Sequence, residues 1–331
     1  MNEARRKKLW FCLLGGMLAA VSLAALRFGS VKIPERIFWK ALFGETGAES
    51  EALILWKLRL PRMLGGILAG SGLALSGVLL QCITDNQMAG PSIVGVNAGA
   101  GFMVILTLSL FPMHHAWLPV AAFFGALGAT ALIIALAGRI GMTRNHVVLA
   151  GMSINALFSA GISFFSFLDS DVLSNYHGFS LGTLAGLHME QLYLPGIMIA
   201  LCAIIAVIAA PQLNLFAFGD ALASAMGVRV RLLRAAAMVL ASASAAAAVS
   251  FAGLLGFVGL MAPHIARRLF GVDLRRLLPG SMLCGALLVV LADLLGRILF
   301  APSELPAGIL LALLGSPFFL MLLMRRKGRY A

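Results

Sequence analysis

Charged residues, and acidic ones above all, are scarce in this sequence. Only 11% of the 331 residues are Asp, Glu, Lys or Arg, and 13 acids stand against 25 bases. Hydrophobic residues make up 61%, and the mean hydropathy is +0.98. Soluble globular domains carry about 25% charged residues. The composition therefore excludes an ordinary soluble fold and indicates an all-α protein that crosses a membrane many times.

Motifs for chemistry within the chain are also missing. There is no G-x-x-x-x-G-K-[ST] phosphate loop, so we expect no bound nucleotide. The four cysteines, Cys12, Cys82, Cys202 and Cys284, lie in apolar runs without close partners, and the histidines lack metal-ligand spacing. We therefore predict no catalytic residue, no metal site and no cofactor in this chain.

The net charge of +12 raises the question of a nucleic-acid partner. The basic residues, however, stand at the ends of apolar runs and not in one cluster, which is the pattern of membrane topology. The expected environment is a lipid bilayer, with no nucleic acid bound.

Ten apolar runs approach the length of about 20 residues that a helix needs to cross a bilayer. The uncharged tract 235–265 is too long for one crossing and short for two, and we divide it because the basic loops then alternate. The predicted spans are 9–26, 63–84, 92–111, 117–138, 147–168, 191–211, 235–251, 252–267, 277–296 and 305–324.

The distribution of basic residues predicts that both termini are cytoplasmic. With ten spans, 17 of the 25 lysines and arginines fall on one side. These 17 include Arg5, Arg6, Lys7, Lys8, Arg139, Arg144, Arg229, Arg231, Arg234, Arg267, Arg268, Arg275, Arg276 and the C-terminal Arg325, Arg326, Lys327 and Arg329. The whole chain, 1–331, is predicted to be one transmembrane permease domain.

Acids are nearly absent from the predicted spans. Asp293 is the only one, and Arg297 lies one helical turn further on, so we expect a local ion pair. An ion-coupled carrier usually keeps ionisable groups in mid-membrane to bind its driving ion. The sequence therefore disfavours an ion-coupled secondary transporter.

The loop at about 212–234 is predicted to carry a short helix at the cytoplasmic surface. Gly219 and Asp220 offer a break and an N-cap, and Gly227 suits the left-handed residue that ends a helix. A helix of two turns is unstable alone in water. Either its own membrane domain or a partner must pack on it, and we favour a partner that pushes on this helix.

Glycines recur at four-residue spacing inside the spans, as at Gly66 and Gly70. Small residues let helices approach closely in lipid. We expect packing within the chain, with a dimer interface along the transport path as the alternative.

Seven segments, in order from residue 58 to the C-terminus, resemble the FecCD-type permease subunits of ABC importers for ferric siderophores, haem and cobalamin. They are RLPR (59–62), GSGLALSGVLLQ (70–81), DNQMAGPSIVGVNAGAG (85–101), VLAG (148–151), LNLFAFGDALASAMGV (213–228), GFVGLMAPHIARRLFGVDLRRLLPGSMLCGALLVVLADLLGR (256–297) and ELPAGILLALLGSPFFL (304–320).

The resemblance implies a type II ABC importer permease fold of about ten transmembrane helices in a bacterial cytoplasmic membrane. It further implies a homodimer around a central path, two ATPase subunits that bind ATP and Mg²⁺ beneath it, and an extracytoplasmic solute-binding protein above it.

The resemblance also assigns site residues. Arg59, Arg62 and Arg297 would meet glutamates of the binding protein, with membrane-interface snorkelling as the alternative. The other two implied sets are the ATPase contacts Phe218, Gly219, Asp220, Ala223, Met226 and Gly227, and the cytoplasmic gate residues Asn86, Met88, Thr143, Arg144 and Asn145.

One departure concerns the gate. The family pattern Asn-Pro-Leu-Ala, followed by an acidic or small residue and Pro, here reads Asn86-Gln87-Met88-Ala89-Gly90-Pro91. The resemblance implies import of an iron–siderophore complex, with haem or cobalamin as alternative cargo. An ion-coupled carrier and an assembly scaffold are the alternatives from other classes.

Overall fold

The computed structural model describes residues 3–327 apart from 44, 46, 93 and 94, and among these residues it contains helices and no strand. Arg329 and residues 93–94 of the third predicted span lie outside the described residues. Ten helices correspond to the ten predicted spans: α1 (Glu3–Arg27), α4 (Leu60–Thr84), α5 (Val96–Leu110), α6 (Leu118–Ile140), α7 (Arg144–Leu168), α9 (Glu190–Leu213), α11 (Val230–Ala252), α12 (Val258–Phe270), α13 (Leu274–Leu299) and α14 (Ala307–Lys327).

The all-α, multi-span prediction is confirmed. Seven helical stretches are long and apolar enough to cross a bilayer, while α5, α12 and α14 are shorter, so the count of ten is approximate. The remaining elements are short: α2 (Glu35–Phe43), α3 (Glu49–Leu53), the π-helical η1 (Ile54–Arg59), the 3₁₀ turns η2 (His115–Trp117) and η3 (Asn214–Phe218), α8 (Ser170–Leu181) and α10 (Asp220–Ala225).

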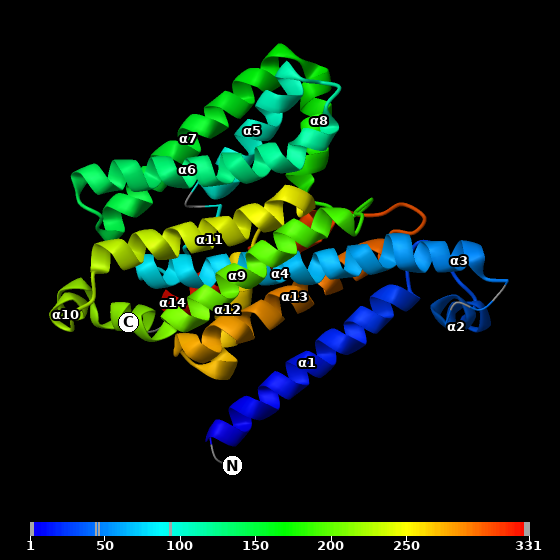
Figure 1. Cartoon of the computed structure of the whole chain (residues 1–331), viewed down its shortest axis with the longest axis horizontal. Coiled ribbons are helices and arrows are strands. Elements are labelled where there is room, and N and C mark those ends of the chain that lie inside the picture. The colour runs from blue at the N-terminus through cyan, green and yellow to red at the C-terminus, as the bar shows by residue number, and fades with distance from the viewer. Residues whose placement is uncertain (1–2, 44, 46, 93–94, 328–331) are drawn as a thin grey trace.

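Helix α4 is the centre of the bundle. It lies between α11 and α13 and also packs on α9 and α12, while α5 to α8 form a second group beside it (Figure 1). In Figure 1, α10 lies at one end of α4, and α2 and α3 lie at the other end. The long helices thus separate α10 at one end of the bundle from α2 and α3 at the other.

Glycines let α4 reach its neighbours backbone to backbone. A methyl group added at Gly70 would collide with the main chain of Gly285 in α13, and one added at Gly77 would collide with the main chain of Gly259 in α12. Such approaches increase dispersion contact between helices that lipid does not push together. The glycine pattern around Gly70 therefore serves packing within this chain, as expected.

The uncharged tract 235–265 forms two helices, as predicted, but the second begins later than expected. Residues 253–257 are not helical, and Gly253 and Phe257 both have positive φ, at +69° and +63°. The freed amide of Leu254 donates to Phe179 O at 3.1 Å. Irregular backbone at membrane depth persists only where protein satisfies it. Helix α12 therefore spans about 20 Å and not a full bilayer.

Candidate functional site

The short helix α10 is present in the loop where the sequence predicted it, but its cap differs from the prediction. Gly219, with φ of +88°, is the N-cap, and Asp220 is the first residue of the helix. The carboxylate of Asp220 makes no capping bond and instead accepts from Arg234 Nη2 at 2.7 Å. The prediction that Asp220 caps α10 is therefore wrong, because a guanidinium occupies the carboxylate.

Three apolar side chains of η3 and α10 face outward. Phe218, the last residue of η3, Leu222 in α10 and Met226, which follows α10, are 62%, 57% and 59% exposed. We call these three the docking surface. Leu222 was missed from the sequence, although it lies four residues before Met226. Water does not favour the exposure of large apolar side chains, so these three residues are candidates for a contact with another protein, and that role stays a prediction.

Ala223 lies on the opposite side of α10. Its side chain is fully buried against this chain's own helices. The prediction that Ala223 belongs to the contact set is therefore wrong for this structure: its small size lets α10 lie close to the bundle. Gly219 and Asp220 are half-buried.

Gly227 ends α10 in the left-handed region, with φ of +84°, as the sequence predicted. Among the described residues, none lies within 4 Å of the position that a β-carbon would take at Gly227. Beside it runs an open groove of about 890 Å³ between the end of α6 and the start of α11, lined in part by Ile134, Gly138 and Leu232. A partner seated on the docking surface would meet this groove next.

The two predicted gate loops lie at the same end of the bundle as α10. In the first, Asn86 follows the last residue of α4 by two positions, and its Oδ1 accepts from Met88 N at 2.9 Å, which forms a tight turn. In the second, the Thr143 hydroxyl caps α7 by accepting from His146 N, and Asn145 is exposed. Their role in gating stays a prediction.

Arg144 joins these loops to the docking helix. Its Nη1 is 2.5 Å from Asp85 Oδ2 at the end of α4, and its Nη2 donates to Phe216 O at 3.0 Å. Its Nε lies 3.6 Å from Asp220 Oδ1. One guanidinium thus touches the first gate loop, η3 and α10, while its own backbone begins α7.

Arg234 of α11 holds the same aspartate from the other side. Its side chain is fully buried, stacks over the Phe216 ring at 5.3 Å and donates to Met142 O as well as to Asp220. Arg234 is buried and Asp220 partly exposed, so loss of the carboxylate would leave the buried guanidinium without its charge partner. Asp220 therefore fixes α10 to the bundle.

At the other end of the bundle, the arginines predicted to dock a binding protein are buried. Arg59, Arg62 and Arg297 are 4%, 9% and 3% exposed. Arg59 donates to the carbonyls of Leu26 and Arg27, both at 2.8 Å, and so fixes the end of α1. Snorkelling arginines extend to water, so that alternative does not describe these side chains.

Arg62 and Arg297 belong to a charge network, and with Arg59, Asp293 and Glu304 we call it the outer arginine cluster. Arg62 Nε lies 2.9 Å from Asp293 Oδ1, and Arg297 Nε lies 3.2 Å from Asp293 Oδ2. The local Asp293–Arg297 pair is therefore confirmed, but Arg62 was missed as its second partner. Arg62 also binds Glu304 Oε2 at 2.6 Å.

This burial changes what the docking prediction requires. Arginine forks suit carboxylates on a partner, yet in this structure the three guanidinium groups already bind acceptors of their own chain. Docking through Arg59, Arg62 and Arg297 stays a prediction. In this conformation, such docking requires that the three arginines exchange their present acceptors for glutamates of the binding protein. Otherwise they can act only indirectly, by shaping the protein surface that covers them.

Glu304 provides a test of the cluster. Burial acts to raise its pKa, but the hydrogen bonds and charges of its partners, Arg62 first, outweigh that effect and lower the pKa below its ordinary value of 4.5. A carboxyl with a lowered pKa adds stability above its unfolded pKa and loses it as pH falls through the folded value. Below pH 4.5, we expect the melting temperature of the purified wild type to drop more steeply than that of Glu304→Gln.

The matched control is Glu190→Gln, at an exposed acid on the same side of the predicted membrane. The melting temperature of this variant should fall with pH as steeply as that of the wild type. Equal pH dependence of the wild type and Glu304→Gln, followed by scanning fluorimetry in detergent, would show that the Arg62–Glu304 contact adds no stability.

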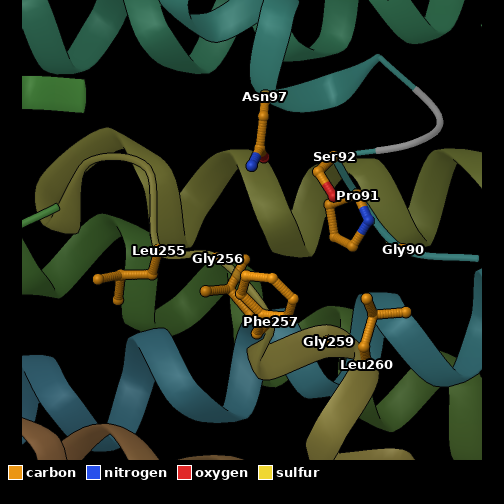
Figure 2. Close-up of a pocket in the computed structure, with 10 residues that line it drawn as sticks. Gly90, Pro91, Ser92, Asn97, Leu255, Gly256, Phe257, Gly259 and Leu260 are labelled. Carbon is orange, nitrogen blue, oxygen red and sulfur yellow. The ribbon is translucent and has the colours of Figure 1, made fainter. Parts of the chain in front are cut away.

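A small cavity lies between the first gate loop and the break before α12. Figure 2 shows Asn97, from the first turn of α5, pointing toward Phe257 beside Pro91 and Ser92. The cavity has a volume of about 10 Å³, which is the space of one water molecule. A metal chelate does not fit there, so this cavity is not a solute site.

Comparison with known proteins gives consistent matches along the chain. The FecCD transport family matches residues 17–325. The hemin transport system permease protein HmuU of Yersinia pestis is 33% identical, over 99% of this chain and 98% of its own length. The iron(3+)-hydroxamate import system permease protein FhuG of Bacillus subtilis is 34% identical, over 93% and 94%.

A solved structure agrees with the fold. It is described as an inward-facing conformation of a metal-chelate type ABC transporter, and it superposes with a TM-score of 0.84 at 29% identity, over 96% of this chain and 99% of the other. Sequence and structure thus match the same class of transport protein over nearly the whole chain.

Proposed function

The chain belongs to the FecCD transport family, and from this premise we propose that it is the permease subunit of an ATP-driven importer for ferric siderophore complexes. The observation that carries the proposal is the docking surface, which is exposed and apolar. It lies on η3 and α10, and Arg144 joins these two elements to Asp85 and to the start of α7. A separate ATPase dimer that binds ATP and Mg²⁺ would seat there. The chain would contribute the solute path and no catalysis.

The other expected partners follow from the same premise. Two copies of the chain would enclose the path, and an extracytoplasmic solute-binding protein would deliver cargo to the end that carries α2 and α3. The protein would span a bacterial cytoplasmic membrane with both termini inside, as the basic loops predict.

Two alternatives differ in a measurable way. Haem is the alternative cargo with most support, since HmuU is a hemin permease of comparable similarity; cobalamin rests on the family resemblance alone. An ion-coupled carrier has less support, because Asp293, the one acid in the predicted spans, is already held by Arg62 and Arg297 and is not free to bind a driving ion.

The test is uptake into proteoliposomes that contain this chain with its cognate ATPase and binding protein. We expect uptake of a radioactively labelled ferric hydroxamate to require ATP inside and binding protein outside, and to survive an ionophore. Preference for hemin or cobalamin would reassign the cargo. Uptake that collapses with the ionophore and needs no ATPase would overturn the proposal, and a complete absence of transport would favour a scaffold.

A further inference from the structure

A single side chain connects three segments that are remote in sequence at the cytoplasmic end of the bundle. Arg144 is separated from Asp85 by 59 residues and from Phe216 by 72, and it touches both as well as Asp220. The guanidinium is planar with donors in fixed directions. This one group therefore contacts the end of α4, η3 and α10 at the same time.

The contacts of Arg144 with the two aspartates are balanced in charge, and a second arginine, Arg234, also binds Asp220. The aspartates Asp85 and Asp220 face the arginines Arg144 and Arg234, so the four charges balance. Arg234 is buried and anchored to Met142 O, immediately before the second gate loop. A displacement of α10 thus moves Asp220 against two arginines, one at the start of α7 and one within α11.

We propose that Arg144 is the positioning residue that transmits movement of α10 to the predicted gate loops. The inference rests on the proposed function, in which an ATPase moves α10. Asp85 is the receiving end on the first gate loop: it has φ of +50° and ends α4 just before Asn86. Arg144 itself is the first residue of α7, within the second gate loop, so both loops respond to the same displacement.

The Arg144–Asp85 ion pair positions the two segments but adds little to the stability of the fold. Asp85 is largely exposed and Arg144 partly so, and exposed ion pairs contribute little to folding. Loss of the pair should therefore leave the bundle folded and the ATPase docked. The expected loss is in the number of solutes imported per ATP hydrolysed, because hydrolysis no longer drives the gates.

The experiment compares Arg144→Gln, Asp85→Asn and the double variant in the assembled transporter, with ATP hydrolysis and ferric-hydroxamate uptake measured on the same proteoliposomes. Arg144→Gln should retain ATP hydrolysis and lower uptake per ATP by about tenfold, within the usual range of coupling between sites. Arg144→Lys should behave similarly, because a point charge cannot reach three acceptors at once.

The double variant shows whether Arg144 and Asp85 act through their mutual contact or whether the two substitutions impair transport independently. If Asp85 and Arg144 act through one contact, Arg144→Gln/Asp85→Asn should be no worse than Arg144→Gln alone. Arg139→Gln, at an exposed arginine in the last turn of α6, is the matched control and should keep the wild-type ratio.

An unchanged ratio in Arg144→Gln, or effects that multiply in the double variant, would overturn the proposal. If Arg144→Gln fails to assemble, Asp85→Asn decides, since Asn also adopts positive φ and the side chain is exposed: it must then lower the ratio. Absence of ATP-dependent uptake in the wild type would instead refute the proposed function.

Discussion

Gly77→Ala is expected to be among the most damaging single-methyl substitutions in the chain. The added carbon would meet the main chain of Gly259, where α4 crosses the start of α12. A flexible side chain could rotate away, but a backbone cannot, so the two helices must separate. Overpacking of this kind typically costs about 1–3 kcal/mol and occasionally more. We expect a clear drop in melting temperature and less folded protein in membranes.

The matched control is Gly128→Ala in α6, where none of the residues that the structure describes lies within 4 Å of the added carbon. Alanine is a better helix former than glycine by about 1 kcal/mol, so this variant should be as stable as the wild type or slightly more so. Gly70→Ala, which faces the main chain of Gly285, should resemble Gly77→Ala. If Gly77→Ala and Gly128→Ala have the same melting temperature, the close approach of α4 and α12 does not contribute to the stability of the bundle.

The sequence predicted those features that local patterns determine. Apolar length located the spans, and alternation of basic loops divided the tract 235–265. It could not locate the start of α12, because hydropathy does not register the positive φ of Phe257. Helix α8 was also missed, since it lies in a polar connection, although its cap at Asp169 is a readable signal.

In the candidate site, too, local sequence patterns predicted some features and could not predict others. Gly227 follows from the chemistry of helix ends, and the Asp293–Arg297 pair follows from helical spacing. The partners Arg62–Asp293 and Arg144–Asp85 are 231 and 59 residues apart, and no local pattern joins them. Whether Ala223 faced a partner or its own bundle was likewise decided by tertiary packing.

Leu222→Asp is expected to uncouple the chain from its ATPase with little effect on its fold. Leu222 is the middle residue of the docking surface, between Phe218 and Met226, and it is exposed in the isolated chain. A carboxylate there would be desolvated on docking without a partner for its charge. Truncating a central anchor typically costs at least about 2 kcal/mol of binding, which is about 30-fold in affinity. Co-purification of the ATPase and ATP hydrolysis stimulated by the binding protein should both be lost.

Val272→Asp is the matched control, at a highly exposed apolar residue in the connection between α12 and α13. Both substitutions place a charge on an exposed position, and such changes usually alter stability by less than about 0.5 kcal/mol. The two variants should therefore melt like the wild type, and only Leu222→Asp should lose the ATPase. If Leu222→Asp retains stimulated hydrolysis, the ATPase seats elsewhere, and the row Phe218, Leu222 and Met226 must then be covered by another part of the assembly, because water does not favour its exposure.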